Sequence, residues 1–162
     1  MTLLPRLIFR YRRSRATARF AVVHLNDEKG STMGVTLISA GLLATLLFLL
    51  SAYVIAGRVK LKIDLGDGGN TAMRQRMRAH GNFTEYVPVA LILLFLVEKE
   101  SIGPRWFVVT MGTVLVVARY WHAQGLLSKE GVSAGRFMGT NLTGLVIVVG
   151  AVACIGRGVG AW

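Results

Sequence analysis

Three polar side chains, Arg78, Asn82 and Glu85, lie three and four residues apart at the start of a long apolar segment. An α-helix turns about 100° per residue, so these side chains fall within about 60° of one another on one helix face. Arg74 extends this face by one more turn. We call these four residues the polar stripe. Cations, an amide and a carboxylate on a single face indicate a candidate active site for an ionic ligand.

A carboxylate inside a membrane helix costs on the order of 3 kcal/mol, and packing alone would use an apolar residue, so Glu85 favours a functional role. The alternative is structural: Arg78 extends to the membrane surface, Glu85 pairs within the protein and Asn82 hydrogen-bonds between helices. Pro88 frees the carbonyl of Thr84 and predicts a kink. The kink either opens a polar pocket or is an ordinary bend.

The composition indicates one integral membrane domain, because 53% of the 162 residues are hydrophobic and only 17% are charged. Four segments of about 20 residues are each long enough to cross a hydrocarbon layer of roughly 30 Å. The predicted spans lie near 34–57, 75–98, 105–126 and 136–156. The sequence therefore predicts an all-α, integral membrane four-helix bundle formed by residues 33–162.

The formal net charge of +11 does not indicate a nucleic-acid partner, because the basic residues cluster beside the apolar segments. Most of them face the first and third loops: Arg58, Lys60, Lys62, Arg74, Arg76, Arg78, Lys129 and Arg136. Only Lys99, Arg105 and Arg157 flank the opposite side. The positive-inside rule then predicts that the first and third loops are cytoplasmic.

Residues 1–32 conflict with this orientation, since this arginine-rich tail would lie on the non-cytoplasmic side. The tail is compatible with a targeting segment or with an extension upstream of a start at Met33. We favour the second explanation, because Met33 directly precedes the first span. Truncation at Met33 is then expected to leave insertion and activity unchanged.

The third predicted span ends with Arg119 and His122, near the same end of the bundle as Arg78. For His122 alone, a hydrogen-bonded interface histidine is the simpler explanation, and the three histidines lack the spacing of a metal site. Arg136 follows a flexible stretch, 131–135, at a helix start that favours an anion, although it equally suits a membrane-flanking anchor. Together Arg78, Arg119 and Arg136 indicate an anionic ligand.

The segment Arg76–Pro88 (RMRAHGNFTEYVP) resembles the start of the second membrane helix in the MAPEG family, the membrane-associated proteins in eicosanoid and glutathione metabolism. The GDGG turn at 66–69 and the pair Arg119 and His122 are similar to a bacterial branch of that family. The resemblance covers Met33 to the C-terminus. It implies a left-handed four-helix protomer in a bacterial inner membrane, assembled as a homotrimer that holds glutathione between neighbouring subunits near the cytoplasmic side.

The resemblance also implies roles for individual residues. His80, off the stripe, would reach a site shared with the adjacent subunit. Arg136 is similar in placement to the arginine that stabilises the glutathione thiolate, and it is the candidate catalytic residue, whereas Leu126 stands where other members have a tyrosine. The implied glutathione contacts are Arg74, Arg78, His80, Asn82, Glu85, Tyr86, Arg119 and His122.

These observations predict a glutathione-dependent transferase or peroxidase, with glutathione as co-substrate and no metal. A free thiol has a pKa of about 8.5, and each unit of depression needs about 1.4 kcal/mol of thiolate stabilisation, which Arg136 in a partly desolvated cleft would supply. The thiolate would attack a lipophilic electrophile or hydroperoxide dissolved in the lipid bilayer. The alternative is a non-catalytic ligand-binding or structural membrane protein that uses the polar stripe for trimer assembly. A channel or transporter is less favoured, because the spans show no inverted repeat.

Overall fold

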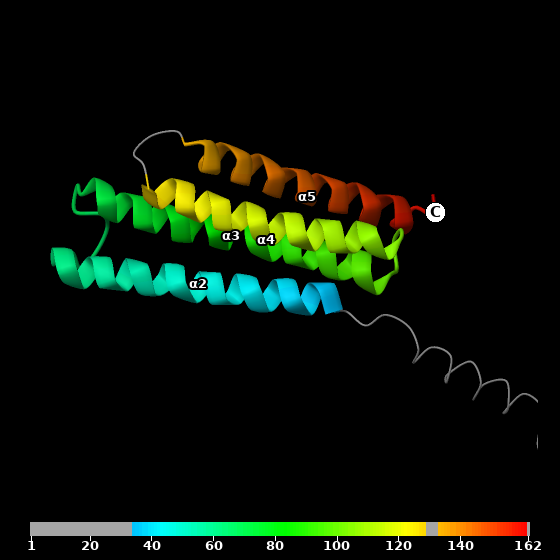
Figure 1. The fold of residues 1–162 in the computed structure, drawn as a ribbon, viewed down its shortest axis with the longest axis horizontal. Coiled ribbons are helices and arrows are strands. Elements are labelled where there is room, and N and C mark those ends of the chain that lie inside the picture. Colours follow the sequence, from blue (N-terminus) through cyan, green and yellow to red (C-terminus); the bar gives the residue numbers. More distant parts are fainter. Residues whose placement is uncertain (1–33, 129–132, 162) are drawn as a thin grey trace, which may run out of the picture. The chain divides into compact units, whose positions relative to one another are not determined.

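The part of the chain that the structure describes contains four helices. The computed structural model describes residues 34–128 and 133–161, so the predictions for the tail at 1–32 lie outside the described residues. The helices are α2 (Gly34–Leu61), α3 (Thr71–Lys99), α4 (Arg105–Ser128) and α5 (Ala134–Gly158). Successive helices run in opposite directions (Figure 1), and α3 and α4 each contact all three other helices. The predicted all-α four-helix architecture is confirmed.

Each predicted span lies within one helix, and the helices extend beyond the spans where basic residues follow. α2 continues to Leu61 with Arg58 and Lys60 in its last turn, where cations stabilise the helix dipole. α3 begins at Thr71 and continues through Pro88, so the kink at this proline stays a prediction. The predicted spans are the stretches expected to lie within the membrane, and each is shorter than the helix that contains it.

Three of the helices, α2, α3 and α5, are long and apolar enough to cross a membrane. α4 has 24 residues, which at 1.5 Å per residue gives a length of about 36 Å. Its second half is more polar, because Arg119, His122 and Gln124 follow one another there. The helix predicted as the third span is therefore long enough to cross a membrane, but it is not among the three that are also apolar enough.

The loop between α2 and α3 makes the tight reversal that its glycines predict. Gly66, Gly68 and Gly69 have φ values of 66°, 57° and 73°, a region that favours glycine because it has no Cβ. Asn70 instead caps α3, and its Oδ1 accepts a hydrogen bond from the Met73 backbone N at 3.0 Å. The loop thus fixes where α3 begins and where the polar stripe starts.

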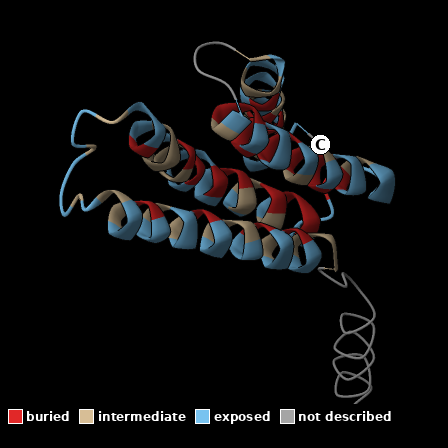
Figure 2. Ribbon diagram, turned by 60° about the vertical axis from the view of Figure 1, so that its left-hand side comes forward, coloured by how far each residue is buried: buried red, intermediate tan, exposed pale blue. Residues whose placement is uncertain are grey.

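Buried residues lie on the faces where the helices meet, and exposed residues lie on the outer faces (Figure 2). The core contains apolar residues of all four helices, among them Leu43, Phe83, Leu94, Leu115 and Val146. Many large apolar residues lie on the outer surface, including Leu37, Phe48, Ile92, Val148 and Ile155. An outer surface this apolar suits contact with lipid and would be a liability in water.

α4 and α5 approach each other closely at glycines. A Cβ atom at Gly139 would lie 2.6 Å from the Ala118 carbonyl oxygen and 2.6 Å from the Cβ of His122. A Cβ atom at Gly135 would lie 2.7 Å from the Trp121 carbonyl oxygen. Small residues allow such close backbone contact in membrane helices. Gly135 is therefore a packing residue inside α5 and not part of the flexible stretch expected at 131–135.

Glu98 near the end of α3 caps the start of α2. The residue is 8% exposed, and its carboxylate accepts hydrogen bonds from the backbone N atoms of Val35 and Thr36, at 3.0 and 2.7 Å. A carboxylate at a helix N-terminus satisfies free N–H groups and favours the helix dipole. The sequence analysis did not single out Glu98, because its partners lie more than sixty residues away in the chain.

Candidate functional site

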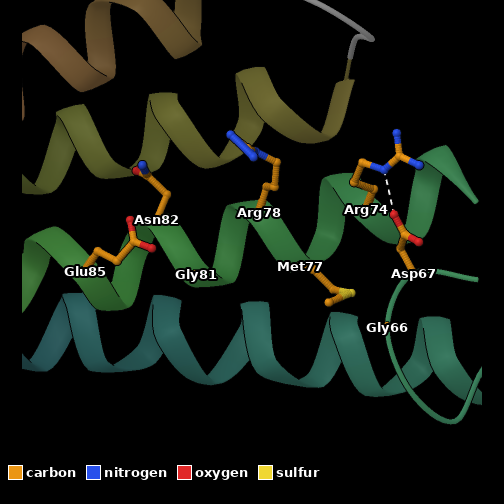
Figure 3. A pocket seen from close by; sticks show the side chains of 8 residues that line it. All are labelled: Gly66, Asp67, Arg74, Met77, Arg78, Gly81, Asn82 and Glu85. Carbon is orange, nitrogen blue, oxygen red and sulfur yellow. Dashed lines mark hydrogen bonds and ion pairs between the residues drawn. The ribbon is translucent and has the colours of Figure 1, made fainter. Parts of the chain in front are cut away.

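The four residues of the polar stripe line one hollow on α3, with a volume of about 550 Å³. Figure 3 shows Arg74, Arg78, Asn82 and Glu85 following one another along the helix. The wall is completed by Gly66, Asp67, Met77 and Gly81. The helical spacing that defined the stripe therefore places its members in a common hollow, which we call the larger hollow.

Arg74 forms an ion pair with Asp67, a residue of the loop between α2 and α3. Its Nε lies 2.6 Å from Oδ2 of Asp67 (Figure 3), and the Arg74 side chain is 55% exposed. The hydrogen bond from Arg74, followed by one from the Gly69 backbone N, holds the pKa of the Asp67 carboxyl below its usual value. Arg74 thus contributes less positive charge to the hollow than its sequence position indicates.

A second hollow of about 270 Å³ has walls from α3, α4 and α5, and we call it the smaller hollow. It shares Arg78 and Asn82 with the larger hollow. The remaining wall residues are His122, Leu126, Arg136, Phe137, Thr140 and Asn141. The structure therefore brings Arg78 and Arg136 together at one site, although they belong to different helices.

Thr140 and Asn141 are site residues that the sequence analysis missed. Thr140 lies four residues after Arg136, so helical spacing from Arg136 would have placed it on the same face. Its Oγ1 lies 3.1 Å from Nδ1 of His122. Asn141 donates a hydrogen bond from Nδ2 to the Phe137 carbonyl oxygen at 2.7 Å, and no sequence signal distinguished it from other polar residues.

His122 joins α4 to the start of α5. Its side chain is only 3% exposed, and Nδ1 lies 3.3 Å from the Arg136 carbonyl oxygen. Its Nε2 is buried and has no hydrogen-bond partner in the described part of the chain. These contacts favour the simpler explanation, a hydrogen-bonded histidine, and they position the first turn of α5 and with it Arg136.

Arg119 lies behind the stripe and lines neither hollow. It is 1% exposed, and its Nη2 donates a hydrogen bond to Oδ1 of Asn82 at 2.7 Å. Its guanidinium carbon lies 5.9 Å from the centre of the Phe83 ring. The expected convergence of arginines thus holds for Arg78 and Arg136, whereas Arg119 reaches the hollows only through Asn82.

His80 and Tyr86 line neither hollow. The shared site with another subunit therefore stays a prediction for His80, and the glutathione contact stays a prediction for Tyr86. Glu85, in contrast, lines the larger hollow and is exposed. In residues 34–128 and 133–161 it has no hydrogen bond or ion pair, so the internal pairing considered for Glu85 is absent there.

The groups around the hollows suit an ionic organic ligand. Guanidinium groups and amides donate hydrogen bonds to carboxylates, and Glu85 can accept from an ammonium group. No three His, Cys, Asp or Glu side chains among the described residues lie close enough together to hold a metal ion. The site therefore offers recognition of a ligand that carries both signs of charge.

The chain matches the MAPEG family profile over residues 36–156. It belongs to the MAPEG family. This MAPEG chain is 34% identical to the inner membrane protein YecN of Escherichia coli strain K12 over 91 residues, which cover 56% of the chain and 69% of YecN. YecN of Escherichia coli O6:H1 strain CFT073 matches with the same values. Family membership and three apolar helices make the chain an integral membrane protein, as predicted.

Proposed function

We propose that this MAPEG protein is a glutathione-dependent membrane enzyme. The observation that carries the proposal is the larger hollow, in which Arg78, Asn82 and Glu85 line one cavity of about 550 Å³. Ligand sites commonly have volumes of roughly 300–1,000 Å³. Glutathione carries two carboxylates and one ammonium group, which these side chains match in sign. The MAPEG family includes glutathione-dependent enzymes, which supports this choice of ligand.

Each group in the larger hollow has a distinct part in binding. Arg78 and Asn82 donate hydrogen bonds to a carboxylate of glutathione, and Arg74 adds a weaker contribution at the rim. Glu85 accepts a hydrogen bond from the ammonium group. Tyr86, next to Glu85 on α3, is a further proposed glutathione contact. His80 reaches a site shared with a neighbouring subunit, which requires the homotrimer that the family resemblance implies.

Arg136 is the proposed activating residue. It lines the smaller hollow, which shares Arg78 and Asn82 with the larger one. We propose that glutathione bound along the stripe extends its thiol past these two side chains toward Arg136. A guanidinium beside the sulfur favours the thiolate, and about 1.4 kcal/mol of preferential stabilisation lowers the thiol pKa by one unit.

The thiolate then attacks a lipophilic substrate that enters from the bilayer. With an electrophilic carbon, a sulfur–carbon bond forms and the leaving group departs with its electron pair. With a hydroperoxide, sulfur attacks the terminal oxygen, the oxygen–oxygen bond breaks and an alcohol leaves after protonation. A second glutathione converts the resulting sulfenic acid to the disulfide and releases water.

We further propose that the protein lies in a bacterial inner membrane with its first and third loops in the cytoplasm. The name of YecN, an inner membrane protein, supports the location. The basic residues at the ends of α2 and α3 that flank the first loop support the orientation. This orientation exposes the larger hollow to the compartment that contains glutathione.

The test is the ultraviolet absorbance of the thiolate when glutathione is added to detergent-solubilised protein. Wild type is expected to show the signal, and Arg136→Ala is expected to lose it while still binding glutathione in calorimetry. Arg105→Ala is the matched control, since Arg105 begins α4 at the other end of the bundle. A wild-type protein saturated with glutathione but without the signal, or an Arg136→Ala variant that keeps it, would contradict the proposed activation.

A non-catalytic role is the second candidate, and the partly buried hydrogen bond between Arg119 and Asn82 favours it. This contact joins α3 to α4 without any ligand. If the stripe serves only assembly, wild type will not bind glutathione, and Asn82→Ala will lower the unfolding temperature. Binding of glutathione at the stripe separates the two candidates.

A further inference from the structure

The side chain of Asn82 can present either its amide oxygen or its NH₂ group to the hollows. Its carboxamide has an oxygen that accepts hydrogen bonds and an NH₂ group that donates two. The two ends are nearly equal in size, so the neighbouring groups decide which end faces outward. Since Asn82 lines both hollows, this orientation decides what the site offers to a ligand at their junction.

Arg119 fixes that orientation. A guanidinium has only donors, so the atom of Asn82 that lies 2.7 Å from Nη2 of Arg119 must be the oxygen. Nδ2 then points away from Arg119 and has no hydrogen-bond partner within the described ranges. The free end of the amide is therefore a donor, beside the donors of Arg78.

The burial of Arg119 is hard to explain by packing alone. The side chain is 1% exposed, and its Nε has no hydrogen-bond partner among the described residues. Burying a guanidinium against a neutral amide is unfavourable, and an apolar side chain would fill the same space at lower cost. Arg119 instead lies where it holds one atom of a side chain that lines both hollows.

We infer that Arg119 is a positioning residue that fixes the Asn82 amide with its N–H donors toward the ligand, so the junction of the two hollows selects a hydrogen-bond acceptor. This inference rests on the proposed function, and it assigns the acceptor to a carboxylate of glutathione. Arg119 itself does not touch the ligand. Its effect on binding passes through Asn82.

A double-mutant cycle tests the inference. Glutathione binding to the full-length protein in detergent is measured by calorimetry for wild type, Arg119→Met, Asn82→Ala and the double variant. Asn82→Ala loses a hydrogen bond to a charged group, which corresponds to a loss of about 10- to 100-fold in affinity. Arg119→Met loses preorganisation only, about two- to tenfold. In the Asn82→Ala background, Arg119→Met is expected to cause no further loss.

Asn82→Asp separates binding from stability. Its carboxylate still accepts from Arg119, so the unfolding temperature is expected not to fall. The second carboxylate oxygen then faces the hollow and repels the ligand carboxylate, and affinity is expected to fall at least about tenfold. A purely structural role for the pair predicts retained binding in this variant.

Arg119→Lys keeps a cationic donor group. It keeps the inference testable if Arg119→Met fails to fold. It is expected to retain more affinity than Arg119→Met, and each variant is checked by thermal unfolding. Additive losses in the cycle, or glutathione binding by Asn82→Asp as tight as in wild type, would overturn the inference while the proposed function stands. Absence of binding to wild type would instead overturn the proposed function, and with it this inference.

Discussion

At the scale of single residues, the charges of the polar stripe differ in how far they are available to a ligand. Arg74 is paired with Asp67, whereas Glu85 has no partner in the described segments. The sequence predicted the stripe, because helical periodicity alone shows which residues of one helix share a face. Its structural alternative included a hydrogen bond from Asn82 to another helix, but it did not name Arg119 as the partner, which lies 37 positions away and depends on how α3 packs on α4.

The pairing of Arg74 with Asp67 predicts a dependence on pH. The folded-state pKa of Asp67 is lowered, mainly by the hydrogen bond from Arg74. The pair is therefore complete above the unfolded-state pKa of about 3.9, and its stabilisation is lost as pH falls through the lower folded-state value. Arg74→Ala is expected to raise the Asp67 pKa in an NMR titration. Arg76→Ala is the control, since Arg76 stacks on Tyr53, and an unchanged pKa in Arg74→Ala would refute the assignment.

At the scale of helices, the sequence predicted where the elements lie more closely than how they pack. Apolar length and flanking charges placed all four helices, because these features act within one segment. The close contact of α4 with α5 was missed, because Gly135 and Gly139 resemble flexible residues until a second backbone lies against them. That contact places His122 of α4 and Arg136 of α5 at the same hollow.

Gly139→Ala tests the close packing of α4 and α5. Its Cβ would lie 2.6 Å from a backbone carbonyl oxygen, so a helix must shift. Overpacking of this kind is expected to lower the free energy of unfolding by about 1–3 kcal/mol. Gly144→Ala on the same helix is the matched control, because a Cβ there meets nothing within 4 Å. Equal stability of the two variants in chemical denaturation would disprove the close contact.

Glu98→Ala tests the cap of α2. The variant leaves the backbone N–H groups of Val35 and Thr36 without their carboxylate acceptor. A loss of about 0.5–2 kcal/mol in the free energy of unfolding is expected. Glu100→Ala, at an exposed position just after α3, is expected to change it little. A Glu98→Ala protein as stable as Glu100→Ala would contradict the capping role.

At the scale of the whole molecule, the sequence predicted the family and the membrane location. The motif Arg76–Pro88 carries most of the resemblance, with the turn at 66–69 and the pair Arg119 and His122, and composition carries the membrane assignment. Assembly could not be derived in the same way, since lipid-facing and subunit-facing apolar surfaces have the same composition. α4 shows a related limit, because Arg119 and His122 lie within it and it is not among the three helices apolar enough to cross a membrane.

The proposed orientation predicts which loops can be labelled from outside. Cys154 is the only cysteine, so a Cys154→Ser background allows single cysteines to be introduced. Ser101→Cys, after α3, is expected to react with a membrane-impermeant maleimide in intact spheroplasts. Asp64→Cys, in the loop between α2 and α3, is expected to react only after lysis. The reverse pattern would refute the orientation.

The most direct test of the account is a calorimetric titration of the solubilised protein with glutathione alone. Wild type is predicted to bind, and Glu85→Ala to bind about 10- to 100-fold more weakly, because a charged hydrogen bond is lost. Glu100→Ala controls for the loss of a carboxylate away from the stripe. Wild type that does not bind glutathione, or Glu85→Ala that binds as tightly as Glu100→Ala, would contradict the claim that the polar stripe is a glutathione site.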